Sequence, residues 1–264
     1  YSTMEFKNEI KNRDPRLAQT IRTTNINVNV TMTGYHLLKY ANDNMSYAGD
    51  SSNDLPLFRL AEVYLNYAEA KAELETITQT DIDNTINKLR ERAGVTGKLN
   101  LYSANANPDP YICDPETGYI NVTGNNKGII LEIRRERTIE LIMEGFRYYD
   151  LMRWKEGQCI AQPFKGIYLP ASAINNAYDI DGDGTNDVCF YTSALQPNVG
   201  NVTYVQLASD GSGTTLSERD HGNLLCYDWI NRTWNENRDY LYPIPRQEIT
   251  LSSGVVMQNP GWND

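Results

Sequence analysis

Four segments in a fixed order constrain the fold of this 264-residue chain more than any other feature of its sequence. Three of them have the apolar spacing of helices, and the last is a proline-rich stretch. Taken singly, each could be an ordinary helix or turn. The segments are 54–75 (DLPLFRLAEVYLNYAEAKAELE), 86–95 (INKLRERAGV), 129–154 (IILEIRRERTIELIMEGFRYYDLMRW) and 240–262 (YLYPIPRQEI, ending in NPGW).

The first segment predicts a long helix over 56–75. Pro56 suits the start of a helix, where its missing N–H costs nothing. The apolar side chains form two stripes, one of Leu57, Leu60, Ala61, Tyr64, Ala68 and Ala72 and the other of Val63, Tyr67, Ala70 and Leu74. A helix with two apolar stripes is expected to lie between two neighbours rather than on a surface.

The second segment predicts a shorter helix over 82–93 that ends at Gly94. Its apolar residues form one narrow seam, which consists of Ile82, Ile86, Leu89 and Ala93. The two helices together have the size of one tetratricopeptide-type unit of about 34 residues. The predicted fold class is therefore mainly α, with a tetratricopeptide-like helical hairpin, long irregular loops and short strands.

The rest of the chain alternates between helical and irregular segments. Residues 98–127 form a loop-rich insertion in which prolines are expected to break any helix. Residues 128–155 predict two helices that meet at Gly145. Residues 157–264 predict loops and short strands, and the last part, 240–262, is expected to be an extended strap without an element of its own.

The first fifty residues have weaker signals. Asp14 and Pro15 predict a turn that leads into a short helix. Residues 26–33 (INVNVTMT) alternate between apolar and polar side chains, which is typical of a half-exposed strand. The chain does not begin with Met, and its start lacks the basic and apolar run of a signal peptide, which indicates a processed product or a fragment.

The most charged stretch of the chain is 134–137 (RRER), within the third segment. Residues three or four apart are neighbours on a helix surface. Local ion pairs between Glu132 and Arg135 and between Arg137 and Glu140 are therefore expected. On this interpretation the stretch is a solvated helix face.

Charge and composition narrow the classes of partner. Acids outnumber bases by 34 to 24, the net charge is −10, and a nucleic-acid surface needs clustered Lys and Arg instead. No stretch approaches the roughly 20 apolar residues of a membrane-spanning helix. The four cysteines form no CxxC motif and leave one disulfide bridge or none equally open. They are Cys113, Cys159, Cys189 and Cys226.

An acidic loop at 179–187 (DIDGDGTND) has the spacing of a calcium site. Carboxylates at loop positions one, three and five, followed by a glycine, match the start of an EF-hand loop. Position twelve is Phe190 instead of the bidentate Glu, so the loop is closer to the open calcium loops of dockerin and thrombospondin-type repeats. The expected role is a structural Ca²⁺, and the alternative is an acidic turn without an ion. The predicted ligands are Asp179, Asp181, Asp183, Thr185 and Asp187, with Asp210 or Glu218 as a completing ligand.

Aromatic residues in polar loops are the candidates for ligand binding. Sugar sites combine a flat ring for the apolar sugar face with Asn, Asp or Arg for the hydroxyl groups. Trp229 and Trp234 lie in YDWINRTWNENRDY, and Tyr102 and Tyr111 lie in the 98–127 insertion among similar neighbours. The alternative for each ring is that it anchors its loop to the core.

Enzyme signatures are largely missing from the sequence. It has no GxSxG, HExxH or P-loop motif, and its two histidines are far apart. Paired carboxylates for glycoside hydrolysis depend on spacing in three dimensions and cannot be assigned from sequence. We therefore predict no catalytic residues and a protein that is not an enzyme.

Together, the four ordered segments resemble the C-terminal region of the SusD/RagB family, with 1–264 as one such region and the N-terminal half of the family fold absent. The resemblance implies an outer-membrane lipoprotein, anchored through an upstream Cys, that captures oligosaccharides at the cell surface and delivers them to a SusC-like TonB-dependent transporter. It also implies that 128–155 is a structural signature packed against the rest of the fold. Two alternatives are a peptide-binding SusD-like or helical scaffold protein and, less favoured, a glycan-active enzyme.

Overall fold

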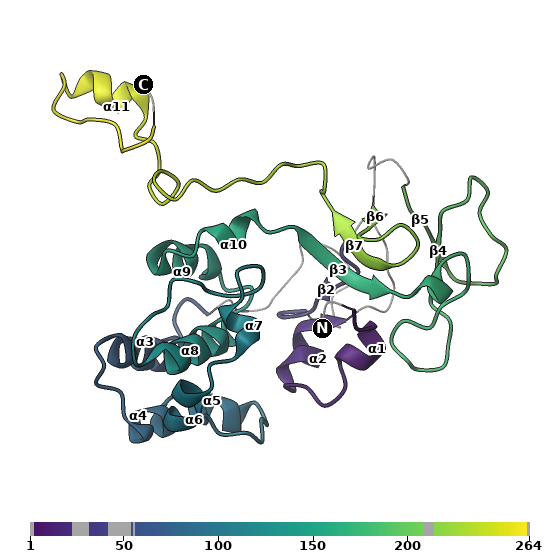
Figure 1. Cartoon of the computed structure of the whole chain (residues 1–264), viewed down its shortest axis with the longest axis horizontal. Coiled ribbons are helices and arrows are strands. Elements are labelled where there is room, and N and C mark those ends of the chain that lie inside the picture. The colour runs from purple at the N-terminus through teal and green to yellow at the C-terminus, as the bar shows by residue number, and fades with distance from the viewer. Residues whose placement is uncertain (1–2, 23–31, 42–53, 55, 209–213, 263–264) are drawn as a thin grey trace. The chain divides into compact units, whose positions relative to one another are not determined.

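The chain divides into two compact units, shown with their element labels in the computed structural model of Figure 1. The strand unit comprises residues 1–57, 91–96 and 163–231, and the helical unit comprises 58–90, 97–162 and 232–264. The structure describes residues 3–22, 32–41, 54, 56–208 and 214–262. Most of the strand predicted at 26–33 lies outside these residues. Each unit has its own hydrophobic core.

The helical unit contains helices in all four segments, together with several short ones. Its described elements are α3 (Leu60–Glu73), α4 (Gln79–Asn84), α5 (Ile86–Arg92, whose last two residues are grouped with the strand unit), α6 (Leu101–Ala106), α7 (Pro110–Cys113), α8 (Lys127–Glu140), α9 (Arg147–Trp154), α10 (Gln158–Ala161) and α11 (Arg246–Leu251). None of the described helices is both long and apolar enough to cross a membrane.

Helix α3 packs mainly against α8 and buries one face only. Its buried apolar residues are Ala61, Leu65, Ala68 and Ala72, and α8 contributes Ile129, Ile130, Leu131 and Ile133 to the same core. The second predicted stripe is exposed instead, with 58% of Val63 and 72% of Leu74 accessible to solvent. The expectation that α3 lies between two neighbours is therefore wrong for the described residues, because only one of its faces meets a packed element.

The predicted helix 82–93 is divided into α4 and α5 at Thr85, whose backbone leaves the helical region at φ −126° and ψ −85°. The Thr85 hydroxyl donates to the Asp81 carbonyl oxygen at 2.6 Å, a contact that tends to bend helices. A capping box between Thr78 and Asp81 begins α4. The predicted seam is still buried at Ile82, Ile86 and Leu89. A tetratricopeptide-like pairing of this segment with α3 stays a prediction, since α8 is the main partner of α3.

Two expectations about proline-rich segments are wrong. The 98–127 insertion contains α6, where the Asn100 side chain accepts a hydrogen bond from the Ser103 N–H, and α7, where Asp109 caps the helix and Pro110 occupies its first turn. The C-terminal strap contains α11 directly after Pro245. Proline is compatible with the first turn of a helix because the N–H it lacks would have no partner there.

The helix pair predicted at 128–155 is confirmed. Helix α8 ends at Glu140, and α9 begins at Arg147. Between them Gly145 has φ +81°, a left-handed conformation that glycine adopts without strain. The chain can therefore reverse between the two helices at the position that the sequence indicated.

The charged stretch 134–137 is buried, so its interpretation as a solvated face is wrong. Arg134, Glu136 and Arg137 expose 6%, 2% and 4% of their surface. Helix α8 contacts α3, α6 and α7, which leaves little of its surface to solvent. Burial on this scale requires that the charges be paired.

The two ion pairs that the sequence predicted for this stretch have different outcomes. The Glu132–Arg135 pair is present at 2.5 Å. The pair of Arg137 with Glu140 is replaced by a buried pair in which the Arg137 Nε donates to Asp150 on α9 at 2.7 Å. The charged run thus ties α8 to α9, which agrees with a packed structural role for this segment.

The strand unit consists of short elements in three small sheets. Its described elements are α1 (Phe6–Glu9), α2 (Arg16–Thr20), β1 (Ile21–Arg22), β2 (His36–Leu37), β3 (Phe164–Leu169), η1 (Ala171–Ala173), β4 (Val188–Tyr191), β5 (Thr203–Gln206), β6 (Thr215–Leu216) and β7 (Gly222–Cys226). β1 pairs with β2, and β7 lies between β3 and β6, all antiparallel, whereas β4 and β5 are parallel. The predicted entry into α2 is confirmed, with Pro15 just before the helix.

The core of the strand unit is built from the inward-facing residues of β3, β4 and β7. Ile167, Leu169, Phe190 and Leu224 are fully buried in it. The four cysteines carry free thiols. The strand unit is therefore held by a small apolar core and strand pairing.

Candidate functional site

An exposed pair of aromatic rings follows β7 in the strand unit. The rings of Tyr227 and Trp229 meet edge to face, with centroids 5.6 Å apart, and expose 41% and 53% of their surface. The backbone turns sharply here, because Tyr227 has φ +56° and its carbonyl oxygen accepts a hydrogen bond from the Ile230 N–H at 3.0 Å. The turn keeps both rings outside the core.

A third exposed ring lies on the neighbouring strand. Phe164 begins β3 and is paired with Cys226, the residue before Tyr227, in the antiparallel ladder. It exposes 54% of its surface. We call Phe164, Tyr227 and Trp229 the aromatic surface. Its members come from two segments more than sixty residues apart in sequence, whose backbones are joined by the pairing of β3 with β7.

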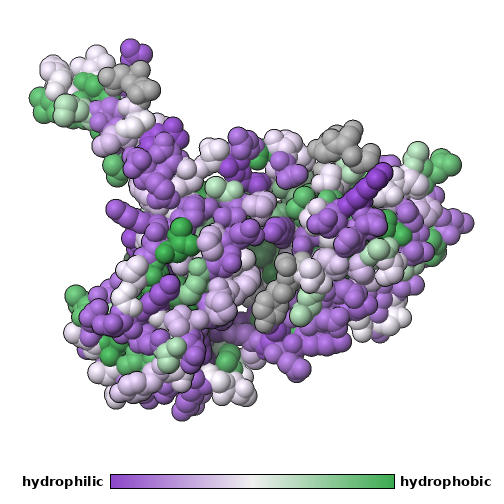
Figure 2. Space-filling model, viewed as in Figure 1, coloured by the Kyte–Doolittle hydropathy of each residue, from purple (hydrophilic) through white to green (hydrophobic). Residues whose placement is uncertain are grey.

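The aromatic surface has the chemistry of a sugar-binding platform. Each ring offers a flat apolar face, and the Tyr hydroxyl and Trp N–H at the ring edges are polar. Asp228, between the two rings in sequence, is exposed and can accept hydrogen bonds from hydroxyl groups. Hydrophobic side chains on the face of the molecule in Figure 2 gather in small groups on a mainly hydrophilic surface.

Trp234 has a different environment, in the helical unit. Its ring packs on Gly157, where an added Cβ would lie 2.0 Å from the indole. It also meets Tyr240 edge to face at 5.0 Å, and the Tyr240 oxygen accepts a hydrogen bond from the Gly157 N–H at 3.1 Å. This geometry favours the anchoring role for Trp234, in which the ring fixes the C-terminal strap to the start of α10.

Tyr102 and Tyr111 are exposed on the short helices α6 and α7 of the helical unit. Tyr102 exposes 81% of its surface. The Tyr111 N–H is held by the Asp109 side chain at 2.8 Å, which orients the first turn of α7. Of the four predicted ligand-binding residues, Trp229 therefore belongs to the strand unit, and Trp234, Tyr102 and Tyr111 belong to the helical unit.

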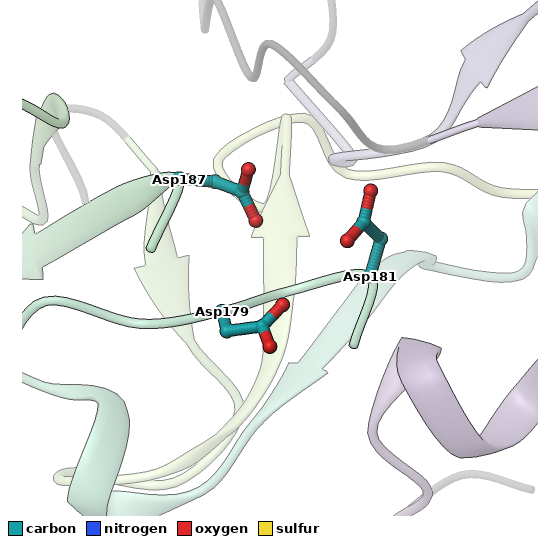
Figure 3. A group of neighbouring side chains, drawn as sticks. All are labelled: Asp179, Asp181 and Asp187. Atoms are coloured by element: carbon teal, nitrogen blue, oxygen red, sulfur yellow. The ribbon is translucent and has the colours of Figure 1, made fainter. Parts of the chain in front are cut away.

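The acidic loop brings three of its carboxylates together (Figure 3). Oxygen atoms of Asp179, Asp181 and Asp187 all lie within 4.8 Å of one another. The Asp179 carboxylate also accepts hydrogen bonds from the N–H groups of Gly182 and Gly184, at 2.7 Å and 2.9 Å, which closes the loop around it. Three acids of the predicted calcium loop thus place their carboxylate groups close together in space.

The other two predicted ligands, Asp183 and Thr185, are not members of this group of three carboxylates. The Asp183 carboxylate accepts a hydrogen bond from the Thr185 N–H at 2.7 Å, and Asp183 is not among the three that converge. Asp210, suggested as a completing ligand, lies outside the described residues. Three carboxylates fit a hard cation, although Ca²⁺ takes about six to eight oxygen ligands, so carbonyl oxygens or water would complete its shell.

Asp187 has the electrostatic signature of a crowded acid. Burial raises the pKa of its carboxyl group, and the nearby charges of Asp181, Asp183 and Asp179 raise it further, although a hydrogen bond from the Ile180 N–H opposes them. Like charges at this spacing disfavour ionisation unless a cation is present. A cation bound between the three carboxylates would therefore reduce their electrostatic repulsion.

Sequence reasoning singled out Trp229 as a candidate but did not include Tyr227 or Phe164. Tyr227 is only two residues away from Trp229, so the sequence alone could have identified it as a candidate. Phe164 could not be found in the same way, because the pairing of its backbone with the residue before Tyr227 depends on the register of β3 against β7.

Comparisons with known proteins assign the chain to a family. The sequence matches the SusD family over residues 22–262, and this chain belongs to that family. A comparison with curated proteins finds no match.

Two solved structures from Bacteroides fragilis NCTC 9343 resemble the chain, each with 23% sequence identity. A SusD-like carbohydrate binding protein has a TM-score of 0.52, with 91% of this chain and 41% of that chain covered. A SusD-like protein has a TM-score of 0.47, with 88% of this chain and 31% of that chain covered. The chain therefore spans less than half the length of either protein. The likeness to the first shows a shared fold.

Proposed function

We propose that this chain is the C-terminal part of a protein that binds oligosaccharides without converting them. The observation that carries the proposal is membership of the SusD family across residues 22–262. The exposed rings of the aromatic surface support it, since they offer the apolar faces on which sugar rings stack. Family membership does not identify the sugar, which depends on the residues around these rings.

The aromatic surface binds by stacking and edge hydrogen bonds. The planes of Tyr227 and Trp229 meet at 61°, so two consecutive sugar units can each contact one ring only if the glycan bends between them. Asp228 then accepts hydrogen bonds from sugar hydroxyl groups. This arrangement favours a curved or helical glycan over a flat, extended one.

The finer assignments come from the family resemblance. In this proposal the complete protein is a lipid-anchored outer-membrane protein at the cell surface and delivers its oligosaccharide to a SusC-like TonB-dependent transporter. A peptide as cargo is the second candidate, because exposed aromatic rings also suit peptide side chains. Catalysis is less favoured, since no nucleophile or acid–base pair emerges from the sequence motifs.

We also propose that the acidic loop holds a structural Ca²⁺. Asp179, Asp181 and Asp187 would ligate it, and the ion would supply the charge that makes their proximity stable. Its role would be to fix the 179–187 turn beside β4. Calcium titration followed by thermal unfolding tests this, with a rise in the unfolding temperature expected for Ca²⁺ and its loss in Asp181→Asn.

The direct test of the proposed function combines binding and turnover. The chain is titrated calorimetrically with neutral oligosaccharides of several backbones, and reducing ends are assayed in the same samples. Saturable binding without new reducing ends is the expected result. New reducing ends would contradict a binding protein, and binding of peptides but of no sugar would move the function to peptide cargo.

A further inference from the structure

A polar cavity lies within the helical unit, apart from the predicted ligand-binding residues. Its volume is about 600 Å³, within the range of about 300–1,000 Å³ that is usual for small-molecule sites. Helices α3, α8 and α9 supply most of its wall. The lining residues are Glu69, Glu73, Asn121, Arg134, Arg153, Trp154, Lys155 and Glu236.

Arg134 gives the cavity a buried donor with unused capacity. Its side chain is 7% exposed, and its Nε has no hydrogen-bond partner in the part of the chain that the structure describes. Its other two nitrogens make only long contacts, at 3.3 Å to Glu156 and 3.4 Å to Glu73. A buried donor without a partner is costly. Nε itself is shielded from solvent, but the weak pairing of the two terminal nitrogens leaves them able to donate to a ligand oxygen in the cavity.

Trp154 lines the cavity but does not offer it an open ring face. The guanidinium groups of Arg134 and Arg153 lie over the indole, 4.7 Å and 4.9 Å from the ring centre. The indole N–H donates to Glu69 at 2.6 Å. Ligand recognition in this cavity therefore depends on hydrogen bonds, in contrast to the stacking available on the aromatic surface.

Glu69 is held in its charged form at the cavity wall. Burial alone would raise its pKa, but hydrogen bonds from Arg153 and Trp154 outweigh burial and lower it. Glu73 differs, because 49% of its side chain is exposed and its ion pair with Arg134 is long. Glu73 thus keeps acceptor capacity for a ligand.

The charges of the wall select against ionic ligands. The wall contains three acids, Glu69, Glu73 and Glu236, and three bases, Arg134, Arg153 and Lys155. A carboxylate or sulfate group would meet repulsion from the acids, and an amine would meet repulsion from the bases. A hydroxyl group can donate to a carboxylate and accept from a guanidinium, so it can bond to both kinds of wall residue.

We propose that this cavity binds one or two units of a neutral saccharide through its hydroxyl groups. The proposal deepens the proposed function and rests on it, because it names a second sugar site of the same protein. Arg134 donates to a sugar oxygen, and Glu73 accepts from a sugar hydroxyl. The cavity holds a short or terminal piece of glycan, whereas the aromatic surface contacts a longer stretch.

The test monitors the four tryptophan indole N–H signals of the whole chain by NMR. Substituting Trp229, Trp234 and Trp262 by Phe one at a time identifies their signals and leaves that of Trp154 by elimination. The probes are neutral gluco-, manno- and xylo-oligosaccharides, with oligogalacturonate as an anionic comparison. We expect the Trp154 signal to shift with a neutral sugar and not with oligogalacturonate.

A matched pair of variants on α3 localises the effect. Glu73→Gln, at the cavity, should weaken the Trp154 response by about tenfold, the effect of losing about 1.4 kcal/mol of binding free energy. Glu62→Gln changes an acid of the same helix that does not line the cavity and should leave the response unchanged. Thermal unfolding of both variants checks that the fold is retained.

Each outcome decides one or both proposals. Shifts of Trp229 alone would overturn the cavity site and leave the proposed function intact. Shifts of Trp154 alone would support the cavity and contradict the aromatic surface. The neutral-sugar assignment would be overturned if the Trp154 signal shifted with oligogalacturonate only. It would also be overturned if the Trp154 signal responded equally to sugar in Glu73→Gln and in the native chain. No shift with any sugar would contradict both.

Discussion

The two units of the chain use charge in opposite ways. In the helical unit, opposite charges are buried and paired, as in Arg137 with Asp150. In the strand unit, three carboxylates of like charge converge at the surface of one loop. Pairing of buried opposite charges holds helices in place, whereas a concentration of like charges is stable only with a partner from solution. The comparison teaches that buried charge in the helical unit serves packing, whereas the charge of the acidic loop in the strand unit has no such partner among the three converging acids.

The largest expected effect comes from breaking the framework at Asp150. Asp150→Ala leaves Arg137 buried without its partner, which should cost about 3–5 kcal/mol of the free energy of unfolding. Urea unfolding followed by circular dichroism measures the loss. Lys71→Ala breaks the more exposed pair with Asp81 and should change stability by no more than about 1 kcal/mol. Equal losses in the two variants would contradict the contrast between buried and surface charge.

A smaller effect is expected where the C-terminal strap meets the helices. Gly157→Ala places a Cβ against the Trp234 ring, and crowding of this kind costs about 1–3 kcal/mol. Gly97→Ala is the control, because a Cβ there meets nothing within 4 Å. Thermal unfolding and tryptophan fluorescence measure both variants. If Gly157→Ala behaves like the control, Trp234 does not anchor the strap.

The smallest effect concerns the acidic loop and depends on pH. The raised pKa of Asp187 means that the folded chain binds this proton more tightly than the unfolded chain does. The resulting stabilisation is present at low pH and is lost as the pH rises through the raised pKa. Without calcium, Asp187→Asn should therefore flatten this decline in stability with rising pH.

The control for this prediction lies in the same loop. Asp183→Asn removes one of the charges that raise the pKa of Asp187 but keeps the Asp187 carboxyl group, and should therefore reduce the pH dependence less than Asp187→Asn does. Unfolding temperatures measured across the acidic range, in the presence of a chelator, compare the two variants. A pH dependence that is unchanged in Asp187→Asn would show that the three acids do not repel one another in the folded chain.

Local sequence signals predicted helix boundaries in both units because they act over one or two turns. The left-handed Gly145 between α8 and α9 is such a signal, and so is Pro15 before α2. The break at Thr85 was not predicted, because it depends on a side-chain bond to the Asp81 carbonyl rather than on apolar spacing. Exposure of Val63 was missed because periodicity shows that a stripe is apolar but not whether a partner covers it.

For the candidate sites, too, the sequence predicted only what depends on neighbouring residues. The acidic loop is local in sequence, and the convergence of Asp179, Asp181 and Asp187 followed from their spacing. The spacing did not show that Asp183 is outside this group. Phe164 joins the aromatic surface only through strand register, and the cavity is enclosed by helices far apart in the chain. Both depend on tertiary packing, which spacing alone does not determine.

The account's central claim is that the strand unit's aromatic surface binds sugar, and the affinity of two ring-removal variants tests it most directly. Trp229→Ala and Tyr102→Ala each remove one exposed ring, from the strand unit and the helical unit respectively. Calorimetry with the tightest-binding oligosaccharide should show a loss of at least about tenfold for Trp229→Ala, since a dominant contact contributes about 2 kcal/mol or more. Tyr102→Ala should bind like the native chain. Native affinity in Trp229→Ala, with a loss in Tyr102→Ala, would contradict the claim and move the site to the helical unit.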